Sequence, residues 1–316
     1  MSELRDLGYP KEGSYPGSYP GSYPGSYPGP DVFISTRSEQ SIFPGYHLKQ
    51  ILGQGHFGQV WEATRDRDGK TIALKIVTLD RRNPTALKDL KREVSILSTV
   101  SDPNCKPFLA CMYGYKYIPE TGDFLIEMEL VEGMTLDQYA RTISDPTILY
   151  KHLLLITKDI VKGLKYLHDN NILHNDIKPD NIIIDKNLTP VLVDFGVSCN
   201  NLTLCKVNST EGMCCRGVRG PNLYISPETI KTRGDYFPES DVWSLGLTLY
   251  KVSTGEFPFQ YKGKPVRNIH REILEYDLDK LNTPNKTLNT IVNRALEKDL
   301  TKRITLEEIS QMLENI

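Results

Sequence analysis

The sequence predicts an α+β domain, in which a small antiparallel β-sheet with one helix precedes a larger, mainly helical part. Two observations support this class. Short apolar runs separated by tight turns fill residues 46–130, with a single helical stretch among them. Apolar residues then recur at helical spacing through several stretches of residues 131–316, which is typical of helices packed on a common core.

The composition is that of an ordinary globular protein, with 316 residues, 39% of them hydrophobic and 25% charged. The net charge of −2 argues against a protein that coats nucleic acid or binds membranes through a basic patch. No apolar run approaches the roughly 20 residues needed to cross a bilayer, and the N-terminus lacks the apolar core of a secretion signal. We therefore expect a cytoplasmic protein without a transmembrane segment, whose six cysteines are reduced thiols.

Residues 1–45 form a separate low-complexity region. Gly-Ser-Tyr-Pro occurs four times in succession from Gly13 to Pro28. Proline at every fourth position prevents a helix, and glycine and serine offer nothing to pack, so we expect a disordered tail and linker. Each repeat presents a tyrosine and a serine, so the tail either recruits a partner or accepts phosphate, or it is only a solvated tether.

The predicted strands surround a glycine-rich turn. Strands are expected at residues 47–53, 61–64, 71–77, 112–118 and 124–130. Between the first two lies Gly53-Gln-Gly55-His-Phe57-Gly58-Gln-Val60, whose glycines allow backbone N–H groups to approach a triphosphate closely. The same spacing also occurs in dinucleotide-binding turns, but there the glycines open a helix rather than join two strands.

A lysine in the third strand needs an anionic partner. Lys75 follows Ala73 within an apolar run, and an unpaired charge is costly there. The next segment, Pro84 to Val100, reads as a helix whose apolar stripe lies beside Glu93. Phosphate oxygens and the Glu93 carboxylate are the expected partners of Lys75.

Two loops in the second half contain the highest concentration of side chains suited to catalysis or metal binding. The first is His174-Asn-Asp-Ile-Lys-Pro-Asp-Asn181 and the second is Asp194-Phe-Gly196, with short apolar runs between them. Together they offer oxygen ligands for a hard cation such as Mg²⁺ and a separate carboxylate, Asp176, that can serve as a base for a hydroxyl.

Taken together, these motifs resemble those of eukaryotic-type protein kinases. The resemblance covers residues 46–316 with every major motif in sequence order. It implies the two-lobed kinase fold, with residues 46–130 as the small lobe and 131–316 as the large lobe. Lys178-Pro179 is similar to the serine/threonine kinases, because tyrosine kinases usually carry Ala and Arg there.

The resemblance also implies the role of each matching residue in phosphoryl transfer. Lys75 would hold the α- and β-phosphates of ATP and be oriented by Glu93. Asp176 would orient or deprotonate the acceptor hydroxyl, with Lys178 near the γ-phosphate. Asn181 and Asp194 would bind Mg²⁺. The remaining nucleotide-binding positions would be Gly53, Gly55, Phe57, Gly58, Val60, Ala73, Met128, Glu129, Val131 and Ile183.

Other residues match structural positions of the same family. Glu228 and Arg303 correspond to the buried ion pair at the end of the activation segment, the chain that follows Asp194-Phe-Gly196. Asp241 corresponds to the residue that supports the catalytic-loop backbone. His174 is expected to pack beside Phe195 rather than to act as a base.

The expected function is therefore an ATP- and Mg²⁺-dependent kinase that acts on Ser or Thr of protein substrates. Two alternatives stay open. One is a pseudokinase or scaffold, although the residues usually lost in such proteins are present. The other is a small-molecule or lipid kinase of related fold, which Pro221 keeps open: it stands where the family has a threonine that contacts Asp176 and Lys178.

Two further departures concern regulation. Asn175 replaces the arginine that binds an activation-loop phosphate in regulated kinases, so we expect activity without phosphorylation of this loop. Four cysteines, at positions 199, 205, 214 and 215, lie in the activation segment. Their spacing does not match a standard zinc site, so they are either a redox switch or incidental thiols, and the segment itself is expected to be irregular.

Overall fold

The computed structural model describes residues 43–55, 58–79, 85–207, 210–217 and 220–316. These residues belong to one compact unit of the chain, residues 38–316. The predictions for the repeat-rich tail therefore lie outside the described residues, except at Phe43 to Gly45.

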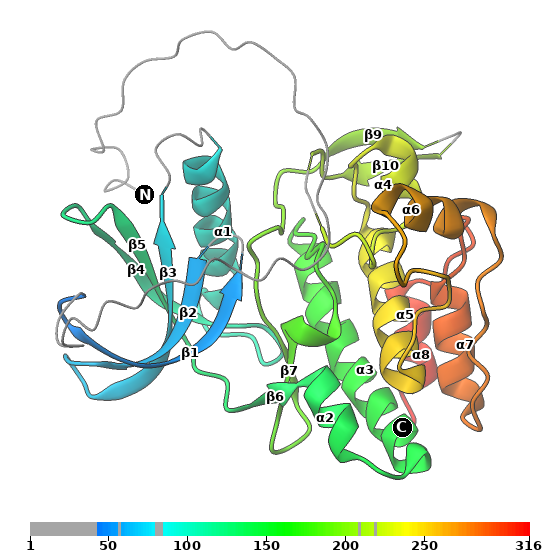
Figure 1. Ribbon diagram of the computed structural model, residues 1–316, viewed down its shortest axis with the longest axis horizontal. Coiled ribbons are helices and arrows are strands. Elements are labelled where there is room, and N and C mark those ends of the chain that lie inside the picture. The colour runs from blue at the N-terminus through cyan, green and yellow to red at the C-terminus, as the bar shows by residue number, and fades with distance from the viewer. Residues whose placement is uncertain (1–42, 56–57, 80–84, 208–209, 218–219) are drawn as a thin grey trace, which may run out of the picture. The chain divides into compact units, whose positions relative to one another are not determined.

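The first part of the chain folds around one five-stranded antiparallel sheet. Its strands are β1 (Tyr46–Gly55), β2 (Gly58–Arg65), β3 (Lys70–Thr78), β4 (Met112–Ile118) and β5 (Asp123–Met128), in the spatial order β1-β2-β3-β5-β4. Helix α1 (Ala86–Ser101) contacts β4 (Figure 1). All five predicted strands and the single helix are confirmed.

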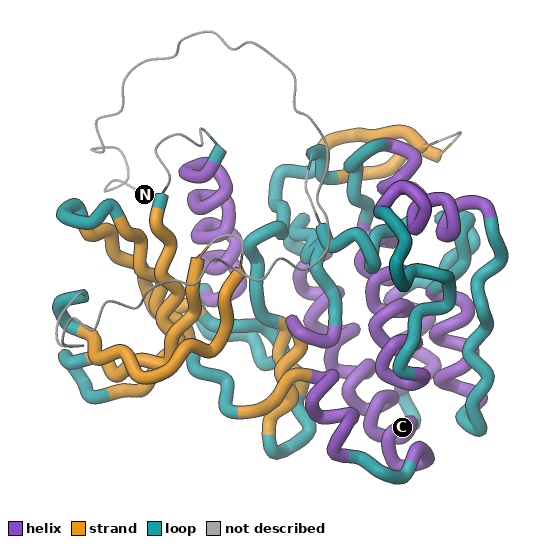
Figure 2. The backbone as a smooth tube through the Cα atoms, viewed as in Figure 1, coloured by secondary structure: helices purple, strands orange, loops and turns teal. Residues whose placement is uncertain are grey.

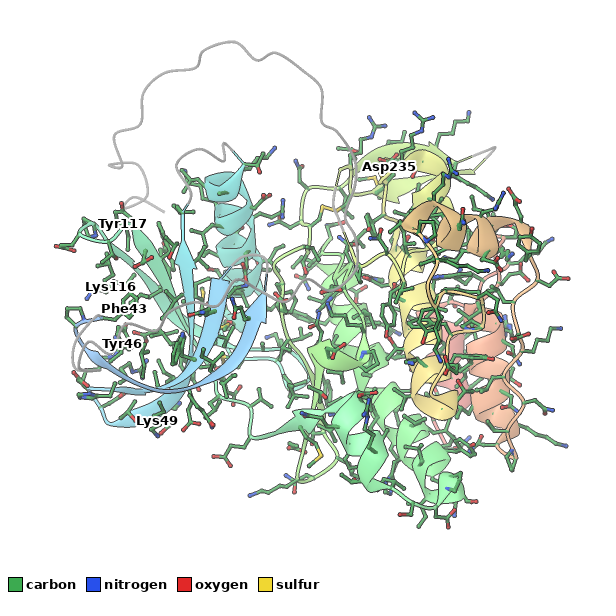
Figure 3. All side chains as sticks on the ribbon, in the orientation of Figure 1. Phe43, Tyr46, Lys49, Lys116, Tyr117 and Asp235 are labelled. Atoms are coloured by element: carbon green, nitrogen blue, oxygen red, sulfur yellow. A yellow bond between two sulfur atoms is a disulfide. The ribbon has the colours of Figure 1, made fainter. Side chains whose placement is uncertain are left out.

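The core of this sheet begins three residues before the predicted domain boundary. Phe43 is buried together with Tyr46 against Ile72 and Leu74 of β3, and Figure 3 shows Phe43 and Tyr46 side by side. The boundary at residue 46 was predicted from composition alone. Phe43 is buried because the folded sheet offers it an apolar surface, which composition does not reveal.

The second part of the chain is mainly helical. It contains α2 (Leu136–Thr142), α3 (Pro146–Asp169), α4 (Pro227–Thr232), α5 (Pro238–Thr254), α6 (Val266–Glu275), α7 (Lys286–Ala295) and α8 (Leu306–Leu313). Helix α3 contacts both α5 and α8, and α5 also contacts α7 (Figures 1 and 2). Helix α5 is buried over most of its length, including Trp243, so it is the centre of this part. No helix of the described residues is long and apolar enough to cross a membrane.

A small sheet positions the two predicted catalytic loops. It consists of β6 (Gly133–Thr135), β7 (Ile182–Asp185) and β8 (Pro190–Leu192), in that order. Because Ile182 pairs with Leu192, the residues just before β7 and just after β8 leave the same end of this hairpin. Asn181 and Asp194 therefore emerge near each other, and the Val193 N–H donates to the Asn181 carbonyl at 2.9 Å.

The activation segment is not irregular, as the sequence predicted, but contains a β-hairpin. Strands β9 (Thr203–Val207) and β10 (Thr210–Cys214) pair antiparallel, with Cys205 opposite Gly212 and Cys214 opposite Thr203. Cys205, Val207 and Cys214 pack against Phe237, at the start of α5. The prediction was wrong because these strands are short and mostly polar, and their stabilising contacts come from a distant part of the chain.

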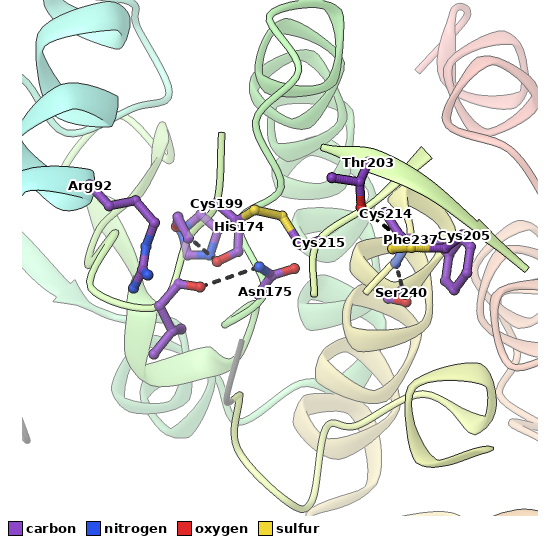
Figure 4. Close-up of a disulfide and its surroundings, with 12 residues drawn as sticks. Arg92, His174, Asn175, Cys199, Thr203, Cys205, Cys214, Cys215, Phe237 and Ser240 are labelled. Carbon is purple, nitrogen blue, oxygen red and sulfur yellow. Dashed lines mark hydrogen bonds between the residues drawn. A yellow bond between two sulfur atoms is a disulfide. The ribbon is translucent and has the colours of Figure 1, made fainter. Parts of the chain in front are cut away.

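The expectation of reduced thiols is also wrong for this structure. All six cysteines form disulfides, Cys105–Cys111, Cys199–Cys215 and Cys205–Cys214. Their Cα–Cα distances of 5.3, 6.2 and 5.8 Å lie in the usual range for disulfides. Two of the three bonds lie in the activation segment (Figure 4).

Candidate active site

The predicted Lys75–Glu93 ion pair is confirmed. Lys75 Nζ lies 2.5 Å from Glu93 Oε1 and 3.5 Å from Asp194 Oδ1. Both members of the Lys75–Glu93 pair are buried. Burial alone would lower the pKa of Lys75, but the carboxylates of Glu93 and Asp194 offset it and raise the pKa. The lysine is therefore a permanent cation, held between the sheet, α1 and the loop after β8.

Asp176 receives two hydrogen bonds on one carboxylate oxygen. Lys178 Nζ donates to Asp176 Oδ2 at 2.7 Å, and Asn181 Nδ2 donates to the same atom at 2.6 Å. The other oxygen, Oδ1, is buried and has no hydrogen-bond partner within the described part of the chain. A buried oxygen without a partner is costly, and a donor such as an incoming hydroxyl would satisfy it.

The backbone of the catalytic loop is held from below by Asp241. The N–H groups of His174 and Asn175 donate to its two carboxylate oxygens at 3.0 and 2.8 Å. His168, on the last turn of α3, contacts the same carboxylate at 2.9 Å. Burial would raise the pKa of Asp241, but His168 and His174 offset it and lower the pKa, so the carboxylate stays ionised. The role of His168 was missed, because only the tertiary fold brings it to Asp241.

His174 is a packing residue, as predicted. Its ring lies 5.1 Å from that of Phe195, and its Nδ1 accepts the backbone N–H of Asp176 at 3.3 Å. The ring is fully buried, and burial lowers the pKa of His174. Nδ1 thus accepts a hydrogen bond within the loop, whereas Nε2 is buried and has no hydrogen-bond partner among the described residues.

Asn181 and Asp194 offer oxygen atoms suitable for a hard cation. Asn181 Nδ2 is directed at Asp176, which leaves its amide Oδ1 to face a ligand. Asp194 has a φ of +65° and a half-exposed side chain, and its Oδ1 accepts the Gly196 N–H at 3.2 Å. Burial would raise the pKa of Asp194, but Lys75 offsets it and lowers the pKa. One amide and one carboxylate oxygen fit the ligand preference of Mg²⁺.

The predicted nucleotide-binding residues line one side of the sheet and β7. In the sheet, Val60 lies opposite Lys75 and Ala73 opposite Met128. Ile183 is half-buried in β7. Gly53 and Gly55 end β1, Val131 follows β5, and Phe57 lies outside the described residues.

Gly58 and Glu129 also have structural roles that the sequence did not predict. A Cβ at Gly58 would lie 2.1 Å from the Ile76 carbonyl oxygen, and Gly58 has a φ of +136°, so the sheet itself requires glycine there. The Glu129 N–H donates to the Cys111 carbonyl at 2.8 Å. Of the Glu129 backbone groups, the carbonyl is therefore the one that stays available to a nucleotide.

The predicted Glu228–Arg303 pair is present at the end of the activation segment. Arg303 Nη1 and Nη2 donate to Glu228 Oε1 and Oε2 at 2.7 and 2.8 Å, and both side chains are buried. Burial would raise the pKa of Glu228, but Arg303 offsets it and lowers the pKa. Pro221, the departure noted in the sequence, lies directly after Gly220, which packs on the catalytic loop.

Comparison with known proteins gives the same family. The protein kinase domain family matches residues 46–313. The serine/threonine-protein kinase dst1 of Dictyostelium discoideum is 30% identical over 273 residues, which cover 84% of this chain and 34% of that protein. The serine/threonine-protein kinase fused of Drosophila melanogaster is 28% identical over 264 residues, or 84% of this chain and 30% of that protein.

An Aurora kinase of Eremothecium gossypii is 30% identical over 271 residues, which cover 84% of this chain and 68% of that protein. The chain spans only about a third of the length of dst1 and of fused. The family match nevertheless covers most of the chain and includes both loops, the Lys75–Glu93 pair and the Glu228–Arg303 pair. The chain therefore belongs to the eukaryotic protein kinase family and is of the serine/threonine type.

Proposed function

We propose that this chain transfers the γ-phosphate of ATP, with Mg²⁺, to serine or threonine hydroxyls of protein substrates. The observation that carries the proposal is the assembly of Lys75, Glu93 and Asp194 within contact distance. In this family, catalysis is mostly positioning and charge neutralisation, so a preformed cation of this kind is the main requirement.

The residues divide the work as follows. Lys75 binds the α- and β-phosphates, and Glu93 keeps its ammonium group in place. Asn181 and Asp194 would hold Mg²⁺, which would supply charge neutralisation at the phosphates when bound. Val60, Ala73 and Ile183 enclose the adenine, and the Glu129 carbonyl with the Val131 backbone fixes its edge.

Asp176 receives the acceptor hydroxyl. Its Oδ1 atom is buried and lacks a partner within the described residues, so it gains a hydrogen bond when a hydroxyl arrives. Lys178 and Asn181 hold Oδ2, which fixes the carboxylate plane and aims Oδ1 at the acceptor. The groups are complete, which argues against a pseudokinase. Asp241 and the Glu228–Arg303 pair favour a protein acceptor over a lipid or small molecule.

The test is phosphate transfer from radiolabelled ATP to dephosphorylated casein in the presence of Mg²⁺. Lys75→Met and Asp176→Ala should each lower transfer by about 10²-fold or more. Lys286→Met and Asp277→Ala are the matched controls, because both side chains are exposed and lie far along the chain from Asp176 and Asp194. Transfer that is unchanged in both active-site variants would refute the assignment. Transfer to a lipid or metabolite extract, but not to casein or other proteins, would favour the small-molecule alternative.

We also propose that activity does not need phosphorylation of the activation loop. Asn175 offers an amide where a phosphate would need a cation, and its Nδ2 donates to the Val197 carbonyl at 3.2 Å. Phosphatase treatment and a Thr210→Ala substitution should leave transfer to casein unchanged. Loss of transfer in both would contradict the proposal.

The repeat-rich tail and the location of the protein complete the proposal. We propose a cytoplasmic kinase whose Gly-Ser-Tyr-Pro repeats recruit a partner, since each repeat displays a tyrosine and a serine. A chain beginning at residue 38 should keep its activity on casein and lose partner capture. The cytoplasm is a reducing compartment, so the three disulfides can be reduced there, and the enzyme can exist in an oxidised and a reduced form.

A further inference from the structure

The activation segment contacts the catalytic loop at Asn175, a residue without the positive charge that would pair with a phosphate. Asn175 has a φ of +63°, a conformation that asparagine tolerates better than most residues. Its Oδ1 atom is buried and has no hydrogen-bond partner among the residues described. The side chain is neutral and fully enclosed, so a phosphorylated loop has no cation to pair with at this position.

The Cys199–Cys215 disulfide lies at this point of attachment (Figure 4). Cys199 exchanges two backbone hydrogen bonds with Leu173, at 2.9 and 3.0 Å, and Leu173 directly precedes the catalytic loop. Cys215 exchanges two more with Tyr236, at 2.8 and 2.9 Å. The four residues share one buried apolar cluster. Through these backbone hydrogen bonds, the disulfide therefore links Leu173, just before the catalytic loop, to Tyr236, just before α5.

Tyr236 carries this link to the acceptor side of the site. Its hydroxyl accepts the Gly220 N–H at 2.7 Å. A Cβ placed on Gly220 would lie 2.6 Å from the Asn175 carbonyl oxygen, so Gly220 rests directly on the catalytic loop. Pro221 follows, at the position where the family has a threonine that contacts Asp176 and Lys178. A chain of contacts thus runs from the disulfide to the segment that must present a hydroxyl to Asp176.

The second disulfide fixes the hairpin next to this link. Cys205–Cys214 spans β9 and β10 and packs on Phe237. Asp235 lies beside the hairpin (Figure 3), and one of its carboxylate oxygens and the two sulfurs lie within 4.8 Å of one another. The two sulfurs are bonded to each other here, so a metal would compete for this group only after reduction.

We propose that Cys199 and Cys215 are positioning residues, whose disulfide holds the acceptor-binding segment in register and makes protein phosphorylation depend on redox state. The inference rests on the proposed kinase activity. In the oxidised enzyme, the covalent link does the work that a phosphate and an arginine do in regulated kinases. In the reduced enzyme, noncovalent contacts hold the segment at this point, among them the four backbone hydrogen bonds and the apolar cluster.

The chemistry of the switch is thiol–disulfide exchange with a low-molecular-weight disulfide such as oxidised glutathione. One thiolate attacks a sulfur of the small disulfide, which releases one small thiol and leaves a mixed disulfide. The second cysteine thiolate then displaces the other small thiol and closes the protein disulfide. Two protein thiols are oxidised, and one small disulfide is reduced to two thiols.

The test compares oxidised and dithiothreitol-reduced enzyme in steady-state transfer to casein. Reduction should lower kcat/KM for casein by about 10- to 100-fold, as expected when an acceptor is misplaced by about an ångström. The KM for ATP and the slow hydrolysis of ATP without acceptor should change by less than about twofold, since Lys75, Glu93 and Asp194 lie outside the link. Oxidised glutathione should restore transfer by the wild type.

Two cysteine pairs provide variants of matched chemistry. Cys199→Ser/Cys215→Ser should be fixed at the low value and insensitive to dithiothreitol. Cys105→Ser/Cys111→Ser, in which the disulfide outside the activation segment is removed, should keep the full redox response. A wild-type far-UV circular dichroism spectrum and an unchanged KM for ATP would establish that the first variant is folded. Faster tryptic cleavage after Arg216 in the reduced wild type gives a second measure of a released segment.

The outcomes separate the inference from the function beneath it. Equal transfer to casein in both redox states, with Lys75→Met inactive, would overturn the inference and leave the kinase assignment intact. No transfer in either state would refute the proposed function and the inference with it. Restoration of the reduced enzyme by Zn²⁺, lost in Asp235→Asn, would also overturn the inference, because a metal at Cys205 and Cys214 would then supply the restraint.

Discussion

Removal of the Arg303 charge should destabilise the protein strongly, because it leaves Glu228 buried and ionised. The Arg303 guanidinium makes two parallel hydrogen bonds to the Glu228 carboxylate, at 2.7 and 2.8 Å. The side chains of the two residues are 0% and 2% exposed. In Arg303→Met, the carboxylate keeps neutral donors such as the Ser240 hydroxyl, at 2.8 Å, but loses the Arg303 cation.

The expected loss in the free energy of unfolding is about 3–5 kcal/mol, the usual cost of an uncompensated buried charge. This corresponds to a factor of about 10² to 5 × 10³ in the folding equilibrium. The Arg303 guanidinium also donates to the carbonyls of Glu239 and Glu297 and lies over the Trp243 ring, so the upper part of the range is expected.

Urea unfolding followed by tryptophan fluorescence and far-UV circular dichroism measures this change. Lys162→Met is the surface control, because the Lys162 side chain is 53% exposed and its pair with Asp159 should contribute little. The double variant Glu228→Gln/Arg303→Met should recover at least half of the loss, since no unpaired charge remains. A loss below about 1 kcal/mol in Arg303→Met, or a double variant less stable than both single ones, would refute the reasoning.

Three further predictions follow from the site and the sheet. The pKa of Glu228 is lowered in the folded state, so its contribution to stability is complete above the ordinary carboxyl pKa of 4.5 and is lost as the pH falls through the lower folded-state pKa. The difference in unfolding free energy between wild type and Glu228→Gln should therefore become smaller as the pH is lowered in an acid titration. A difference that became larger would contradict this direction of the pKa shift. Gly58→Ala should lower unfolding free energy by about 1–3 kcal/mol, because its Cβ would meet the Ile76 carbonyl, whereas Gly53→Ala, with open space around the new atom, should leave the melting temperature unchanged. Asp241→Asn should reduce kcat for casein with little change in the KM for ATP, because an amide can accept only one of the two backbone N–H groups that the carboxylate accepts; an unchanged kcat would count against this role.

Much of the fold was predictable because its signals are local. Glycine turns between apolar runs identify the strands of the sheet, and the stripe on α1 identifies the single helix beside it. Lys75 in an apolar strand implied a carboxylate partner, and Glu93 supplies it. The two loops were recognised because their polar residues have a chemical purpose that packing alone does not explain.

Contacts between residues that lie far apart in the sequence could not be predicted in the same way. The partnership of His168 with Asp241 joins residues 73 positions apart. The requirement for glycine at position 58 arises from the Ile76 carbonyl on a neighbouring strand, and not only from a bound phosphate. Both depend on distances between elements, which a sequence pattern does not contain.

The sequence by itself determined the family, the catalytic residues proposed for the two loops and the loss of a phosphate-binding arginine at position 175. Only the tertiary structure decided the state of the activation segment. Cys205 and Cys214 meet because of the register between β9 and β10, and Cys199 and Cys215 meet because Leu173 and Tyr236 hold their backbones. Cysteine spacing cannot specify such pairs, since disulfide formation depends on a Cα separation of about 4.4–6.8 Å that folding alone provides.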